Sequence, residues 1–89
     1  NLKFMDYTIT LSDAQVKSLE YVAYDPKDWI ENAALSRASV AAQDILKINT
    51  EHCNANSIQL AVGEDAQITQ AYTLGLVKTA KARKDDKKQ

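Results

Sequence analysis

The residues best suited to chemistry are one histidine and one cysteine, which are adjacent as His52-Cys53. Neighbouring residues on a helix point about 100° apart, so these side chains do not converge on one metal ion or form a nucleophile–base pair. We expect His52 near a helix C-terminus, where the dipole favours positive charge, and Cys53 as a small buried side chain. The sequence therefore predicts no metal site.

Other catalytic signatures are also missing. The only glycines, Gly63 and Gly75, lie too far apart for a glycine-rich phosphate loop. The carboxylates of Asp25, Asp28 and Glu31 are explained by helix capping. We therefore predict no catalytic residue, no cofactor and no small-molecule substrate, and expect a protein that is not an enzyme.

The composition indicates a small helical domain. The chain has 89 residues, of which 45% are hydrophobic and 26% are charged, which suits one modest core. Two glycines and one proline favour long uninterrupted helices. No apolar run approaches the ~18 residues of a membrane-spanning helix, so no membrane partner is expected. We predict one helical domain over residues 1–80 and a charged, flexible tail over residues 81–89.

Charge is unevenly distributed along the chain. Residues 1–77 carry five basic and ten acidic side chains, whereas residues 78–89 carry six basic and two acidic ones. A cationic tail can bind nucleic acid, acidic lipid or an acidic protein patch. The simpler interpretation is that these cations complement a helix C-terminus and keep it solvated. The aromatic residues lie in the acidic part, which disfavours nucleic-acid binding.

Two segments have the alternation of short strands. Tyr7–Leu11 is rich in β-branched and aromatic residues, and residues 57–62 alternate in the same way. A lone strand needs a partner for its backbone groups, so Tyr7–Leu11 must pair either with residues 57–62 or with another subunit.

Capping signals place the helices. Ser12 and Gln15 form a capping box, which starts a helix ending near Ala23. Asp25-Pro26 ends that helix and starts a second one, which we expect to reach about Cys53.

A third helix is expected from residue 64. Its apolar stripe contains Ile68, Ala71, Tyr72, Leu76 and Val77, with Gly75 inside the helix for a close helix contact. The predicted fold is mainly α, with three helices, one of them long and Ala-rich, and one or two short β-strands.

The long helix is the predicted interaction surface. At 1.5 Å per residue it extends ~42 Å, beyond the ~30 Å diameter of a compact domain of this size. Its many alanines and serines permit another helix to approach closely. The predicted interface comprises Trp29, Ile30, Ala34, Arg37, Ala41, Ile45 and Ile48. The alternative is that the other helices of the same chain cover this face.

Two interface residues allow more than one interpretation. Arg37 lies in an apolar stripe, where it either pairs with Asp44 or Glu31 of a neighbouring copy or extends to solvent. Trp29 either anchors the preceding helix in the core or anchors a partner protein.

A resemblance covers about residues 6–48. The stretches from Tyr7 to Gln15, Leu19 to Ala23 and Asp25 to Asn32 resemble the start of small uncharacterised proteins encoded near tail or tail-fibre genes of tailed bacteriophages. In those proteins an initiator methionine directly precedes such a strand, which implies Met5 as the natural start. The resemblance carries no catalytic motif and implies no site residue.

The resemblance and the residue pattern lead to the same expectation. We expect a non-enzymatic structural or assembly protein of a phage tail or tail fibre, located in the virion after assembly in the host cytoplasm. It would act through a homo-oligomer or through contacts with a larger phage structural protein. The alternatives are a small regulator that binds a host protein or nucleic acid, and an accessory domain of an enzyme. Thr8 and Thr10 on the outward strand face disfavour the reading of DNA bases.

Overall fold

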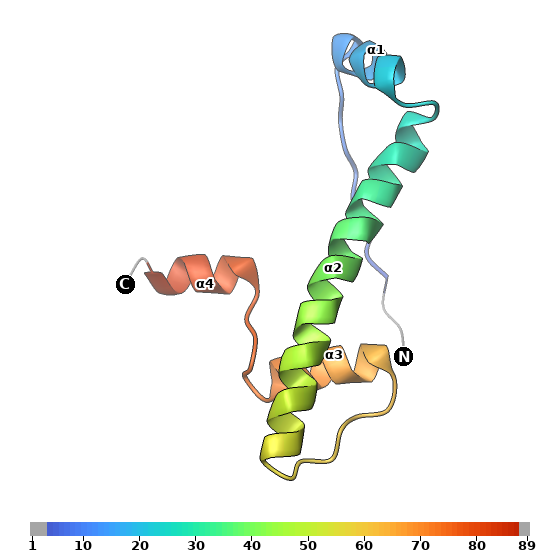
Figure 1. The fold of residues 1–89 in the computed structure, drawn as a ribbon. Helices are drawn as coiled ribbons and strands as arrows, with labels where there is room; N and C mark the ends of the chain where they lie inside the picture. Colours follow the sequence, from blue (N-terminus) through green and yellow to red (C-terminus); the bar gives the residue numbers. More distant parts are fainter. Residues whose placement is uncertain (1–3, 88–89) are drawn as a thin grey trace. The chain divides into compact units, whose positions relative to one another are not determined.

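The computed structural model describes residues 4–87, which form four helices and no strand (Figure 1). The helices are α1 (Asp13–Val22), α2 (Pro26–Ala55), α3 (Glu64–Thr73) and α4 (Ala80–Lys87). The mainly α class is confirmed, whereas the expected three helices with short strands are wrong in both respects. The chain divides into two compact units, Asn1–Leu35 and Ser36–Gln89, and the division falls within α2.

The start of α1 follows from the predicted capping box. The Ser12 hydroxyl accepts a hydrogen bond from the Gln15 amide at 3.2 Å, and the Gln15 side chain accepts one from the Ser12 amide at 2.9 Å. These bonds satisfy two backbone donors near the helix start. The helix ends at Val22, and the extended backbone of Ala23 leads the chain away from it.

Asp25 caps α2 as predicted. Its carboxylate accepts a hydrogen bond from the Lys27 amide at 3.1 Å, and its carbonyl accepts one from the Trp29 amide at 2.9 Å. Pro26 is the first helical residue, where its missing N–H costs nothing. The helix is 30 residues long and therefore ends two residues beyond the predicted Cys53.

The end of α2 is set by a serine in the left-handed conformation. Ser57 has φ of 57°, and the Ile58 amide donates back to the Cys53 carbonyl at 2.9 Å. Asn56 also contributes, because its side chain donates to the His52 carbonyl at 2.9 Å. The left-handed residue at this helix end is therefore a serine, although glycine and asparagine are more usual there.

Residues 57–62 form a loop and not the predicted strand. Side chains of α3 bind the backbone of this loop. Gln70 donates to the Gln59 carbonyl at 2.9 Å and accepts from the Ala61 amide at 3.0 Å. Gln67 donates to the Ala61 carbonyl at 3.0 Å. Three of the backbone groups that a strand would use are therefore bound to glutamine side chains.

Gly75 ends α3 and does not lie inside a helix. Its φ is +73°, its amide donates to the Tyr72 carbonyl at 3.0 Å, and the Leu76 amide donates to the Ala71 carbonyl at 2.9 Å. This bond pair is the Schellman motif, in which glycine supplies the left-handed residue. The expected close helix contact at Gly75 is wrong, because a Cβ there would meet no atom within 4 Å.

The expected tail is largely helical. Thr79 caps α4, because its hydroxyl accepts from the Ala82 amide at 3.0 Å and its carbonyl accepts from the Arg83 amide at 3.1 Å. Seven of the eight residues of α4 are exposed, with Ala82 half-buried, so this segment is solvated as expected. Residues 88 and 89 of the predicted tail lie outside the described residues.

Candidate self-association surface

The middle of α2 is exposed along its whole circumference. Every residue from 31 to 41 is exposed, including the predicted interface residues Ala34, Arg37 and Ala41. Helical segments bury an apolar face when the rest of the chain packs on them. This part of the predicted interface is therefore accessible to another molecule.

The first unit buries very little of its apolar surface. Ala23 is the only buried side chain among its described residues, and α1 itself buries none. Val16 and Leu19 are half-buried, whereas Val22 is 70% exposed. Large apolar side chains of this unit that are more than half exposed are Phe4, Met5, Tyr7, Ile9, Tyr21, Val22, Tyr24, Trp29 and Leu35.

Trp29 is one of these exposed side chains. It is 52% exposed, so it is only partly covered by the rest of the chain. Its neighbour Ile30 is half-buried and lines a shallow depression of about 370 Å³. Tyr7, Ile9 and Leu11 line the same depression, together with Pro26. The apolar side of the extended N-terminal segment therefore faces the first turns of α2.

The C-terminal part of the predicted interface lines a groove within the second unit. Arg37, Ala41, Ile45 and Ile48 follow one face of α2 and border a volume of about 350 Å³. The opposite side of the groove comes from Tyr72, Val77, Lys78, Ala80 and Arg83. The chain thus covers part of this face itself, as the alternative interpretation proposed, but leaves Ile48 43% exposed.

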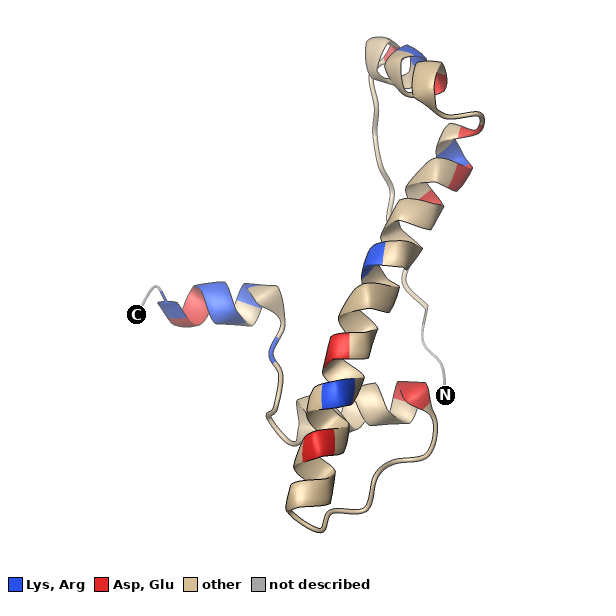
Figure 2. Cartoon of the chain, in the orientation of Figure 1, with Lys and Arg blue, Asp and Glu red and all other residues tan. Residues whose placement is uncertain are grey.

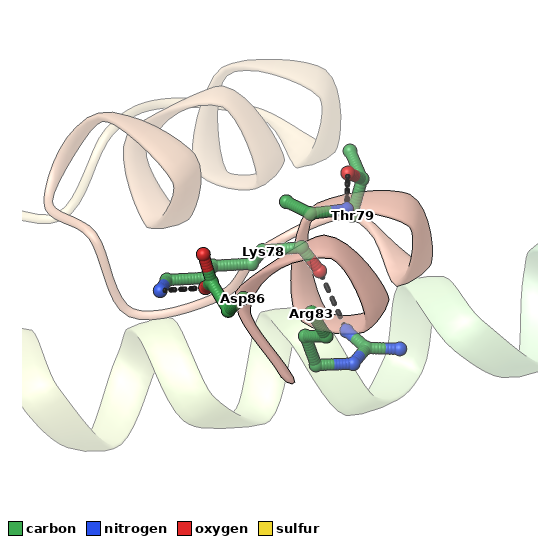
Figure 3. Close-up of polar contacts among 5 residues, drawn as sticks. Lys78, Thr79, Arg83 and Asp86 are labelled. Carbon is green, nitrogen blue, oxygen red and sulfur yellow. Dashed lines mark hydrogen bonds and ion pairs between the residues drawn. The ribbon is translucent and has the colours of Figure 1, made fainter. Parts of the chain in front are cut away.

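Two of the cations that line this groove, Lys78 and Arg83, have partners in α4 and the residues before it. Figure 2 shows the concentration of lysine and arginine on α4. Lys78 forms an ion pair with Asp86 at 2.7 Å (Figure 3). The Arg83 guanidinium donates a hydrogen bond to the Lys78 carbonyl at 2.6 Å. Lys81 also pairs with Asp85, at 3.4 Å. Such exposed pairs contribute about 0–1 kcal/mol each.

A polar cluster that sequence reasoning missed joins α2 to α3. Asn49 is fully buried, and its side-chain amide donates to the Gln70 oxygen at 3.0 Å. The Cys53 thiol lies 3.7 Å from that same oxygen and 3.9 Å from the Asn49 oxygen. Because Gln70 also binds the backbone of Gln59 and Ala61, this side chain connects α3 both to α2 and to the loop of residues 57–62. The sequence does contain one signal for this cluster, because Asn49 lies four residues before Cys53 and therefore on the same face of α2.

His52 and Cys53 lie as their sequence positions suggested. Cys53 is 1% exposed, whereas His52 is half-buried in the last turns of α2. The His52 Nδ1 atom lies 3.3 Å from the Asn56 side-chain nitrogen. In residues 4–87, no three His, Cys, Asp or Glu side chains are grouped so that they could hold a metal ion. Within the same residues, no helix combines the length and apolarity needed to cross a membrane.

Comparisons with protein-family models, curated proteins and solved structures gave no match to this chain.

Proposed function

We propose that this chain is a non-enzymatic structural or assembly protein that works by oligomerisation and protein–protein contacts. The particle in which it assembles is proposed to be a tailed-phage virion, with a tail or tail-fibre component as the larger partner. That part of the proposal is supported by the resemblance of residues 6–48 described above.

The observation that carries the proposal is the exposed apolar surface of residues 4–35. An isolated helix of ten residues such as α1 is marginal in water, because tertiary packing supplies most helix stability in proteins. The first unit buries only Ala23 among its described residues, so little packing within the unit supports α1. A partner surface that covers side chains such as Val22 and Trp29 would supply the missing burial, at about 25 cal/mol per Å².

The exposed centre of α2 supports the same proposal. Ala34, Ala38 and Ala41 are small and share one face of α2, so the backbone of a second helix can come close to this face. The interface residues Trp29, Ile30, Ala34 and Arg37 would then contact the partner directly. Contact at Ala41, Ile45 and Ile48 would require the partner to enter the groove described above.

A matched pair of substitutions on α2 tests the proposal. Ala34→Leu places a large side chain on the predicted interface, and Ser36→Leu places the same side chain about 200° around the helix. Both positions are exposed, so neither change disturbs packing within the chain. We expect the wild type and Ser36→Leu to form the same oligomer, measured by sedimentation velocity. We expect Ala34→Leu to dissociate and to lose no more helical circular dichroism than the ten residues of α1 contribute.

Two results would contradict the proposal. One is a monomeric wild type at all concentrations. The other is an oligomer that neither substitution changes, because the α2 face would then lie outside the interface.

A further inference from the structure

We propose that residues 7–11 of two copies pair as an antiparallel two-stranded ribbon centred on Ile9. This inference rests on the proposed function, since it requires self-association, and it names the segment through which two copies join.

The first observation is an extended segment with free backbone groups. Residues 4–11 precede α1 as an extended chain (Figure 1). None of their backbone N–H or C=O groups is hydrogen-bonded to another residue of the described range 4–87. Tyr7–Leu11 nevertheless has the composition of a strand, with alternating large apolar and threonine side chains. An extended segment of this composition without backbone partners favours pairing with another chain, as the edge strand of a sheet does.

The second observation concerns the strand partner expected within the chain. Residues 57–62 were the candidate, but the carbonyls of Gln59 and Ala61 and the amide of Ala61 are bound by Gln67 and Gln70. A ladder with Tyr7–Leu11 would have to break these bonds and also release the buried Asn49 amide from Gln70. The same segment of a second copy has no such competing bonds among the described residues.

The segment is complementary to itself in one antiparallel register. With Ile9 opposite Ile9 of the second copy, Tyr7 lies opposite Leu11 and Thr8 lies opposite Thr10, on both sides of the centre. Apolar residues then meet apolar residues, and threonines meet threonines, which are favourable cross-strand pairs. A shift by one residue would place every apolar side chain opposite a polar one, which is a threonine, Ser12 or Asp6. Asp6 and the capping residue Ser12 bound the ribbon at its ends.

The apolar side of the ribbon has a surface to pack on. A two-stranded ribbon alone is at best marginally stable in water. Tyr7, Ile9 and Leu11 line one depression with Pro26 and Ile30 of α2, so this strand face is already directed toward an apolar helix start. Ile9 is still 58% exposed there, which leaves apolar surface for the second strand to cover.

Cysteine cross-linking tests the pairing and its register. Directly opposite residues in an antiparallel pair have Cα atoms about 4.5–5.5 Å apart, within the range of a disulfide. Residues offset by two positions are about 8 Å apart, which is too far. Ile9→Cys should therefore form a covalent dimer on mild oxidation, with a yield at least about tenfold above that of Thr8→Cys or Thr10→Cys alone.

The threonine variants are matched controls for each other. An equimolar mixture of Thr8→Cys and Thr10→Cys should cross-link, although neither does so alone. Wild type provides the blank, since its native Cys53 is buried. Self-cross-linking of all three variants would indicate parallel strands and overturn the proposal. Self-cross-linking of Thr8→Cys without Ile9→Cys would overturn the register, and no cross-link in any variant would overturn the pairing.

The light-scattering mass of wild type separates this inference from the proposed function. An oligomeric wild type without the Ile9→Cys cross-link would overturn the ribbon and leave the proposed function standing. A monomeric wild type would overturn both.

Discussion

Replacing Gln70 by leucine should destabilise the second unit strongly, because one side chain completes several hydrogen bonds there. Its oxygen accepts from the buried Asn49 amide and from the Ala61 N–H, both at 3.0 Å, and its nitrogen donates to the Gln59 carbonyl at 2.9 Å. Leucine has a similar size but no polar atom. The Gln70→Leu variant therefore leaves the Asn49 amide without its acceptor.

The magnitude follows from the burial of each group. Asn49 is 0% exposed, and an unsatisfied buried donor costs about 1–3 kcal/mol. Ala61 is half-buried and Gln59 is exposed, so water can replace part of their bonds, and each loss costs about 0.5–1 kcal/mol. We expect the free energy of unfolding to fall by about 2–5 kcal/mol.

Urea denaturation followed by circular dichroism at 222 nm is the assay. With a slope of about 1–1.5 kcal/mol/M, the midpoint should fall by at least about 1.3 M. Gln43→Leu is the matched control, since Gln43 is exposed on α2, and its effect should stay within about 0.5 kcal/mol. The double variant Asn49→Leu/Gln70→Leu should cost at least about 1 kcal/mol less than the two single changes added together, because it removes both partners. A Gln70→Leu variant within about 0.5 kcal/mol of wild type would refute the reasoning.

Three further substitutions test the helix ends. Ser57→Gly should stabilise the chain by about 0.5–1 kcal/mol, seen as a higher melting temperature, because glycine accepts φ of 57° without strain; an unchanged or lower value would contradict this. Gly75→Ala should lower the unfolding free energy by about 1 kcal/mol through the backbone alone, since the added Cβ meets no atom within 4 Å; a neutral result in urea denaturation would argue against the left-handed cap. Thr79→Ala should melt α4, moving the NMR chemical shifts of residues 80–87 toward coil values and leaving α3 unchanged; helical shifts throughout would show that the cap is dispensable.

Local signals predicted the first two helices well. The Ser12 capping box and the Asp25-Pro26 junction involve residues within three positions of each other, and the structure contains both as expected. Such caps depend on short-range hydrogen bonds, which a sequence pattern can specify without knowledge of the tertiary fold.

The errors arose where distant side chains decide the backbone conformation. Residues 57–62 alternate like a strand, but Gln70 and Gln67 from α3 bind their backbone groups and hold a loop. Alternation alone cannot distinguish these outcomes, because it reports only which side chains are apolar. Gly75 was placed inside a helix because its apolar neighbours continue the helical spacing, although its φ of +73° ends the helix.

Part of the predicted interface on α2 is covered by the chain itself, and helical periodicity does not indicate which segment of the same chain packs on a helix face. Helical spacing correctly grouped Arg37, Ala41, Ile45 and Ile48 on one face, but that face borders residues 72–83 of the same unit. Ala34 and Trp29 remain exposed on α2. The involvement of the whole set in self-association stays a prediction.

The central claim is that this chain functions as an oligomer, and molar mass in solution tests it most directly. Light scattering after size exclusion, at two protein concentrations well separated from each other, should give a mass of two or more times the 9.9 kDa chain. We expect this multiple to be the same at both concentrations. A mass of a single chain at both concentrations would contradict it.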